Sequence, residues 1–213
     1  MASPLEKARK DPESVKAKIL MAARRTFGVY GFHGTTIRMV AQELGMDIST
    51  LHYHWGDKRD LYEAVVLDIN NDLGQNLIKV EKMIHGLPLP DRLAIAIDYM
   101  TDYLYLHPEI SNLIIFRHFG KTREEAGIDF KVPEFTYDIA RSMGLLKDKK
   151  NVSSGVMLMI LALINSMHCF ISGENFFRPI VALNREEYIA EAKKALKFIH
   201  IPAFTQGSDQ TDR

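Results

Sequence analysis

The stretch GTTIRMVAQELGMDISTLHYHW, from Gly34 to Trp55, decides the fold prediction. Its first half places apolar residues at helical spacing, and Gly45 then ends that helix because glycine adopts the left-handed C′ conformation without steric cost. Asp47 follows as the predicted cap of a second helix of only about two turns. Such a helix is too short to serve as a structural strut, so its polar residues need a functional explanation.

The second helix has two distinct faces. Leu51 and Trp55 are four residues apart, so they share the face that anchors it to the preceding helices. The outward face carries Ser49, Thr50, His52 and Tyr53, with Ile48 and His54 at its edges. A short helix with two anchors and a hydrogen-bonding face is typical of the recognition helix of a helix-turn-helix, which enters the major groove of DNA.

The rest of the chain also reads as helical. No segment alternates strictly over the length of a strand, whereas helical spacing recurs almost everywhere, so the sequence predicts an all-α fold of about nine helices. The first helix is predicted to begin at Asp11 and Pro12. A fourth helix runs from Asp57 to Ile84, about 40 Å, which is long enough to link two domains. Pro202 is predicted to end the last helix.

Composition and charge narrow the class of protein. The 213 residues are 46% apolar, and the longest uninterrupted apolar run, GVMLMILALI at Gly155–Ile164, is shorter than a membrane span. The N-terminus lacks the apolar segment of a secretory signal, so we expect a cytoplasmic protein with no membrane partner. Net charge is zero, but residues 1–56 hold eight basic and five acidic side chains. The positive charge is therefore concentrated where DNA binding is predicted.

The arrangement of cysteine and histidine residues in the sequence does not indicate a metal site or a cofactor site. Cys169 is the only cysteine, and its neighbours Met167 and Phe170 favour a buried, unreactive thiol. His52 and His54 are two residues apart, so they do not face each other on a helix, and no carboxylate or cysteine completes a ligand set. We therefore expect no bound metal and no cofactor.

Residues 13–63 resemble the DNA-binding domain of the tetracycline-repressor (TetR) family. The matching positions are Ile19-Leu20, Ala22-Ala23, Phe27, Gly31, Gly34-Thr35-Thr36, Val40-Ala41, Gly45, Thr50-Leu51, Tyr53-His54-Trp55, Lys58 and Leu61. The resemblance implies a three-helix DNA-binding domain at residues 1–56, with the helix-turn-helix at about 36–55. It also implies a helical effector-binding and dimerisation domain at residues 57–204, and we expect a disordered tail at residues 205–213.

The resemblance also assigns roles to single residues. The positions that hold phosphates are Thr35 or Thr36, Tyr53, His54 and Lys58, and those that approach base edges are Ile48, Ser49 and His52. Arg38 and Thr50 complete the candidate DNA-contacting set, although a solvated surface charge is the commoner role for a single arginine. Hydroxyl groups and a lysine are suitable donors to phosphate oxygens.

The C-terminal region resembles the family's variable effector domain. The effector-binding candidates are Tyr99, Tyr103, Phe116, Phe135, Asn165 and His168. Aromatic residues at helical spacing are more often plain core, so Asn165 and His168 are the better candidates, because a polar residue in an apolar helix needs a partner. The run Gly155–Ile164 is apolar around its circumference, so a second chain is expected to cover one side. The interface candidates are Val156, Met157, Ile160 and Leu163.

These features predict a homodimeric, sequence-specific transcriptional regulator that releases its operator DNA when it binds a small apolar or amphipathic effector. One alternative is an architectural DNA-binding protein without an effector, which predicts no cavity in the C-terminal domain. The other is a helical enzyme that modifies a small molecule. Glu109, His118 and Asp138 are only scattered titratable groups rather than a nucleophile–base pair or a carboxylate dyad, so we expect no enzyme.

Overall fold

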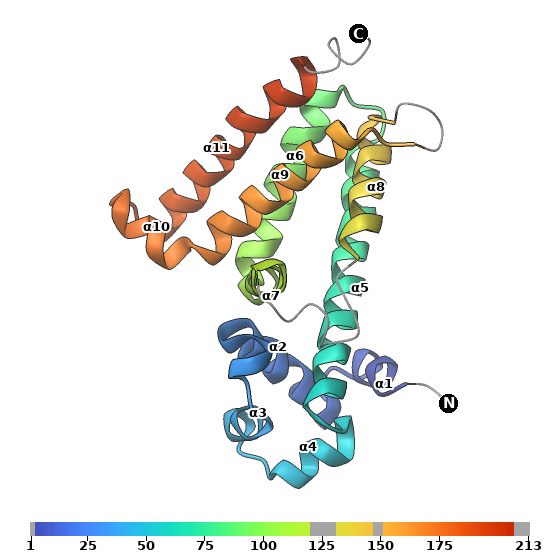
Figure 1. Ribbon diagram of the computed structural model, residues 1–213, viewed down its shortest axis with the longest axis vertical. Helices are drawn as coiled ribbons and strands as arrows, with labels where there is room; N and C mark the ends of the chain where they lie inside the picture. Colours follow the sequence, from blue (N-terminus) through green and yellow to red (C-terminus); the bar gives the residue numbers. More distant parts are fainter. Residues whose placement is uncertain (1–2, 120–130, 147–150, 207–213) are drawn as a thin grey trace. The chain divides into compact units, whose positions relative to one another are not determined.

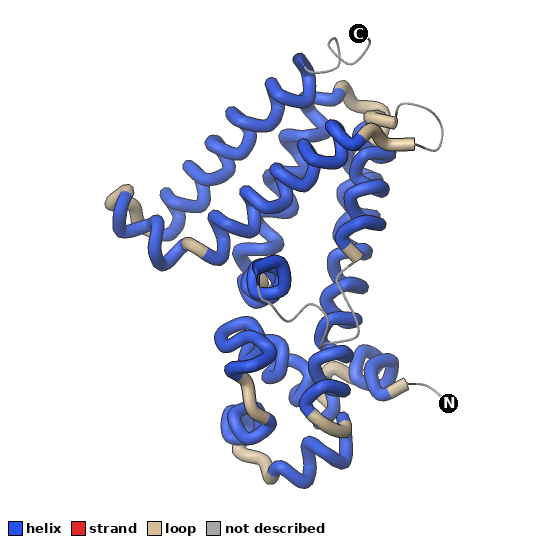
Figure 2. Tube along the Cα trace, in the orientation of Figure 1, coloured by secondary structure: helices blue, strands red, loops and turns tan. Residues whose placement is uncertain are grey.

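The computed structural model describes residues 3–119, 131–146 and 151–206, and every regular element in these ranges is an α-helix (Figures 1 and 2). The all-α prediction is confirmed. The described residues form eleven helices rather than about nine. The two unpredicted ones, α1 (Pro4–Lys10) and α10 (Glu174–Ile180), have seven residues each, too few to produce a clear helical period in the sequence.

The helices pack into two compact units. The head unit comprises the chain up to Asp72 together with α7 (Pro108–Phe119), and the body unit comprises Leu73–His107 and the described residues from Lys131 onward. The helix α5 (Lys58–Ile84) passes from the head unit into the body unit without interruption. The packing boundary therefore differs from the predicted functional boundary between residues 56 and 57, which stays a prediction.

The head unit is built on three helices that follow α1. They are α2 (Val15–Gly34), α3 (Ile37–Leu44) and α4 (Ile48–Trp55). Its fully buried side chains include Ile19, Phe27, Val40, Leu51 and Leu61. These are the apolar positions that recur at helical spacing in the sequence, so the pattern of burial follows the pattern of hydrophobicity.

The start of α2 corrects the sequence prediction. Ser14, rather than Asp11, caps the helix, and its hydroxyl accepts a hydrogen bond from the N–H of Ala17 at 3.2 Å. Asp11 instead ends α1, whose own start is fixed by a reciprocal capping box between Ser3 and Glu6. The first cap was misplaced because α1 had not been recognised.

The body unit contains the remainder of α5 and five further helices. They are α6 (Leu89–Leu106), α8 (Val132–Met143), α9 (Ser154–Ser172), α10 and α11 (Arg185–Gln206). The helices α6, α9 and α11 lie side by side (Figure 1). Their shared core includes Ile97, Leu104, Ile160 and Leu196, each at most 1% exposed.

The end of α11 also differs from the prediction. The helix continues through Pro202 to Gln206 instead of ending before the proline. A proline removes one backbone donor, and near a helix end that loss is small; the hydroxyl of Thr205 also donates to the carbonyl oxygen of Ile201 at 3.0 Å. The predicted disordered tail, residues 205–213, thus begins inside a helix, and residues 207–213 lie outside the described residues.

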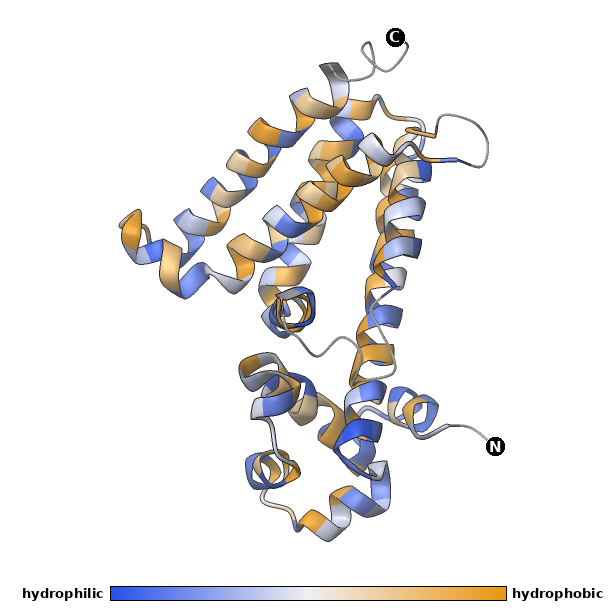
Figure 3. Cartoon of the chain, in the orientation of Figure 1, coloured by the Kyte–Doolittle hydropathy of each residue, from blue (hydrophilic) through white to orange (hydrophobic). Residues whose placement is uncertain are grey.

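The helix α9 is apolar along most of its length (Figure 3). Among the described helices it alone is long and apolar enough to cross a membrane by length and composition, and 28% of its most apolar window is buried. One such helix is weak evidence for a span, because core helices pass the same test. Leu158 is 66% exposed and Cys169 is also exposed. The prediction of a buried Cys169 is wrong, because it lies on a face of α9 that the described part of this chain leaves uncovered.

Candidate nucleic-acid interface

The turn between α3 and α4 is set by local backbone chemistry. Thr36 caps α3, and its hydroxyl accepts a hydrogen bond from the N–H of Met39 at 3.2 Å. Gly45 has φ 63° and ψ 33°, the left-handed conformation predicted for this position. Asp47 precedes α4 in an extended conformation; its side chain makes no capping bond, and its carbonyl oxygen accepts from the N–H of Thr50 at 3.0 Å.

Two buried side chains and two hydrogen bonds anchor α4. Leu51 is 1% and Trp55 is 6% exposed, as their spacing predicted. The indole N–H of Trp55 donates to the carbonyl oxygen of Lys16 at 3.2 Å, and the ammonium of Lys16 donates to the carbonyl oxygen of His54 at 3.1 Å. The first turn of α2 therefore holds the C-terminal end of α4. Sequence reasoning missed this role of Lys16, because lysine gave no local signal.

The opposite face of α4 is open to solvent. Ser49 and His52 are exposed, and Tyr53 is 84% exposed, which is high for so large an aromatic residue. Nδ1 of His52 lies 2.8 Å from the carbonyl oxygen of Gly56. Because a carbonyl only accepts, this contact puts the proton on Nδ1 of the neutral ring and leaves Nε2 as an acceptor. The exposed face thus presents a hydroxyl, a phenol and an oriented imidazole.

The remaining candidate DNA-contacting residues differ in their exposure to solvent. Thr35 is fully buried and donates its hydroxyl to the carbonyl oxygen of Gly31 at 2.8 Å, so it is a core residue and is not available to a phosphate. Thr36 and Arg38 are exposed at the start of α3. Ile48, Thr50 and His54 are half-buried at the edges of the α4 face. Of the two threonines that the sequence left open, only Thr36 is thus accessible, and its contact with a phosphate stays a prediction.

Lys58 stands at the start of α5, where a cation is unfavourable to the helix dipole. Its ammonium lies 4.5 Å from the ring centroid of Phe32, and partial burial lowers its pKa. The aromatic face stabilises the charge on one side only. The other side of the ammonium is therefore a suitable place for a phosphate oxygen to accept a hydrogen bond.

The turn before α5 fixes the position of Lys58. Gly56 has φ 77°, and a side chain there would collide with the carboxylate of Asp60. The carboxylate of Asp57 accepts from the N–H groups of Asp60 at 3.0 Å and Arg59 at 2.7 Å, and these bonds lower the pKa of Asp57. Sequence reasoning recognised Asp57 only as a helix start.

The effector-binding candidates are split between the two units. Phe116 belongs to the head unit, where its ring is 3.6 Å from the position that a Cβ on Gly31 would occupy. In the body unit the hydroxyl of Tyr99 donates to Oδ1 of Asn76 at 2.8 Å, and His168 is 4% exposed. Tyr103, Phe135 and Asn165 are half-buried in the same unit. Phe116 therefore belongs to a different packing unit from the other five.

The four interface candidates on α9 also differ in burial. Ile160 is 1% and Leu163 is 8% exposed, so both are core residues of the body unit rather than surface residues. Val156 and Met157 are half-buried. Beyond the first two residues of α9, its exposed positions are Leu158, Ala162 and Cys169, at helical spacing. The sequence thus indicated that α9 carries an uncovered apolar surface, but it did not show which face of the helix that surface is on.

The described residues contain no group of three or more His, Cys, Asp and Glu side chains that could hold a metal ion. The ring of His52 contacts the carbonyl oxygen of Gly56, whereas Lys16 bonds the backbone carbonyl of His54 and not its ring.

Known proteins match this chain most specifically over the helix-turn-helix. Residues 19–65 match the family model of bacterial regulatory proteins of the tetR family. The dual transcriptional regulator CecR of Shigella flexneri is 34% identical over 39% of this chain, and the repressor AcnR of Corynebacterium glutamicum is 33% identical over 50%. These alignments span 38% and 56% of the two relatives. The relatives are thus matched over about half their length or less.

Solved structures resemble the chain over most of its length. A TetR-like regulator from Rhodococcus has a TM-score of 0.59 at 16% identity, covering 88% of this chain and 94% of that one. The fatty acid degradation regulator FadR from Bacillus halodurans has a TM-score of 0.59 at 12% identity, covering 84% and 93%. At these identities the likeness shows the fold alone. Residues 19–65 thus match the DNA-binding domain of tetR-family bacterial regulatory proteins, and the chain has the fold of TetR-like regulators.

Proposed function

We propose that this chain binds a DNA operator as a homodimer and represses transcription, and that a small apolar or amphipathic effector releases it. The observation that carries the proposal is the two-faced α4. Leu51 and Trp55 anchor one face, while Ser49, His52 and Tyr53 project from the other. A helix of eight residues held in this way fits the major groove.

The proposed contacts divide into two kinds. Thr36, Arg38, Tyr53 and Lys58 supply donors to phosphates, which fix the register of the protein on the duplex. Ser49 and His52 read base edges, and Ile48 contacts a thymine methyl group. The Nε2 acceptor of His52 suits an amino group of adenine or cytosine, since these are the donors that the major groove presents.

Dimerisation is supported by the exposed apolar face of α9. Leu158 is 66% exposed, and Phe198 on the adjacent helix α11 is 83% exposed. Covering such a surface stabilises association by removing apolar area from water. We therefore place the dimer contact on α9 and α11, with Leu158 as its centre in place of Ile160.

The proposed effector site lies in the body unit. Tyr99, Asn165 and His168 are polar or aromatic residues on its inner helices, and a mostly apolar site with a few polar groups is usual for small ligands. We expect the protein to act in the cytosol and to turn over no substrate.

Selection of binding sequences from a pool of random duplexes tests the proposal. A homodimer with two recognition helices should enrich a two-fold symmetric site whose half-sites are about one helical turn, 34–36 Å, or a multiple apart. Enrichment of no sequence would contradict sequence-specific binding. Enrichment of a single half-site would contradict the dimer.

A further inference from the structure

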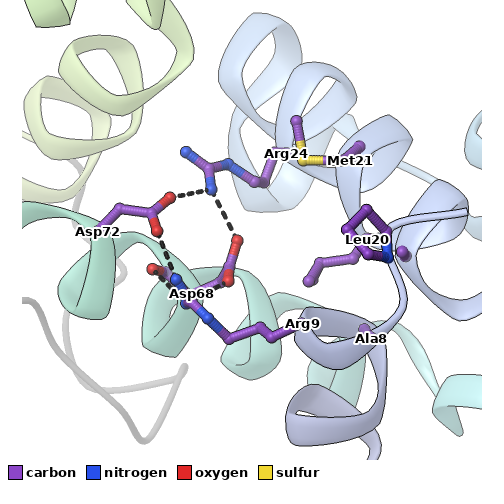
Figure 4. A pocket seen from close by; sticks show the side chains of 9 residues that line it. Ala8, Arg9, Leu20, Met21, Arg24, Asp68 and Asp72 are labelled. Atoms are coloured by element: carbon purple, nitrogen blue, oxygen red, sulfur yellow. Dashed lines mark hydrogen bonds and ion pairs between the residues drawn. The ribbon is translucent and has the colours of Figure 1, made fainter.

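An almost fully buried arginine joins three helices of the head unit. Arg24 of α2 is 3% exposed, and its Nη1 donates to Oδ2 of Asp68 and to Oδ2 of Asp72, both at 2.6 Å (Figure 4). Its Nη2 donates to Oε1 of Glu109, the second residue of α7, at 3.2 Å. One guanidinium therefore bonds α2 to both α5 and α7.

A second arginine completes the cluster from α1. Nη1 of Arg9 lies 2.6 Å from Oδ1 of Asp68, and its Nη2 lies 2.6 Å from Oδ1 of Asp72. Asp68 and Asp72 are four residues apart on α5, where two ionised carboxylates repel each other unless cations lie between them. Burial raises the pKa of Asp68, and the charges of Arg24 and Arg9 oppose that rise. The two arginines thus place positive charge against both carboxylates of the pair.

The contact between α2 and α7 depends on a glycine as well as on charge. A Cβ added to Gly28 would lie 2.6 Å from Cβ and 2.9 Å from Cα of Glu109, closer than atoms can pack. The two helices approach this closely only because position 28 has no side chain. The close approach also brings the Glu109 carboxylate within reach of Arg24.

The same helix α2 holds the recognition helix at its other end. Lys16, in the first turn of α2, bonds the Trp55 indole and the His54 carbonyl of α4. Closely packed helices transmit displacement because protein interiors are nearly incompressible. A displacement of α5 or α7 at Arg24 is therefore passed along α2 to α4.

We propose that Arg9, Arg24 and Glu109 are positioning residues for operator binding: they fix α5 and α7 on α2 and so set the orientation of α4. This inference rests on the proposed function, since it names the residues through which the DNA-contacting helix is controlled. None of the three touches DNA in this role. Arg24 is too buried to do so, and Glu109 has the wrong charge.

Two variants and a control test the inference. Glu109→Gln removes a charge from α7 without removing its volume, and Gly28→Ala separates α2 from α7 while every charge is kept. Glu186→Gln is the matched control, an exposed acid in the first turn of α11. Hydrogen exchange of the free, full-length proteins is measured first, because it needs no DNA. Affinity is then measured for a duplex that the wild type has selected from a random pool.

We expect both variants to lose protection in α4, beyond any loss in α3, with the body unit unchanged and the control identical to the wild type. We expect affinity for the selected duplex to fall about 5- to 10-fold, a usual size for coupling between sites. Arg9→Gln should weaken binding similarly with an unchanged salt slope, because no phosphate contact is lost.

Unchanged protection of α4 in both variants would overturn the inference, as would affinities within about twofold of the wild type, the range of ordinary surface changes. A flatter salt slope for Arg9→Gln would assign Arg9 to a phosphate instead and would also overturn it. If the wild type selects no duplex, the proposed function fails, while hydrogen exchange still decides the coupling of α7 to α4.

Discussion

The indole N–H of Trp55 bonds the carbonyl oxygen of Lys16, 3.2 Å away, and ties the end of α4 to the start of α2. The ammonium of Lys16 in turn donates a hydrogen bond to the carbonyl oxygen of His54. Together with buried Leu51, these contacts hold a helix of eight residues that would not be stable alone. The orientation of α4 thus depends on α2.

Trp55→Phe tests this attachment. The substitution removes the donor and part of the buried ring, so the free energy of unfolding should fall by about 1–2 kcal/mol. Urea denaturation of the two proteins gives this difference from the midpoints at equal slope. A variant as stable as the wild type would show that the indole bond contributes nothing to the anchoring.

Lys58→Ala should weaken binding to all DNA sequences alike. Loss of one phosphate contact releases about one counterion fewer, so the slope of log K against log salt should flatten by about one. Binding is measured by fluorescence anisotropy at several salt concentrations. Lys82→Ala is the control, an exposed lysine at the other end of α5. An unchanged slope for Lys58→Ala would remove Lys58 from the phosphate-contacting set.

Leu158→Asp should convert the dimer into monomers, because it places a charge in an apolar interface where no partner neutralises it. Leu106→Asp is the matched control, since Leu106 is 75% exposed in the same unit but lies on α6. Sedimentation velocity at micromolar concentration distinguishes the two states. A dimeric Leu158→Asp protein, or a monomeric wild type, is incompatible with the α9 interface.

His54 should make the head unit less stable in acid. Burial, and then the charge of Lys16, lower its pKa in the folded state below the usual value. The unfolded chain therefore binds the proton more readily, and stability present above the unfolded pKa of about 6.5 is lost as the pH falls through the folded pKa.

His54→Gln should reduce this loss, which is measured as the change in unfolding free energy between neutral and mildly acidic buffer. His52→Gln is the control, an exposed histidine of the same helix. Equal acid sensitivity of His54→Gln and the wild type would show that His54 is not responsible.

Local chemistry allowed the helix-turn-helix to be predicted from sequence. Gly45 ends α3 because few other residues adopt its conformation cheaply, and Leu51 and Trp55 share a face because a helix has 3.6 residues per turn. Both depend on neighbours within a few positions, so the sequence contains the necessary information. The same reasoning placed Ser49 and His52 on the open face.

Features that depend on distant contacts were not predictable in this way. Thr35 and Thr36 are adjacent hydroxyl residues, and only the packing of α2 buries the first. The side of α9 that stays exposed depends on where α6, α8 and α11 lie, so Leu158 was not distinguished from Ile160. The packing of α7 against α2 depends on Gly28 and Glu109, which are far apart in the chain.

Competition by single-base variants of the selected duplex, measured for the wild type and for His52→Ala, tests most directly whether α4 reads base edges. The account predicts that His52→Ala reduces discrimination by about 1–3 kcal/mol at one base pair in each half-site and leaves the other positions unchanged. Equal weakening of binding to every duplex, including unrelated DNA, would contradict it.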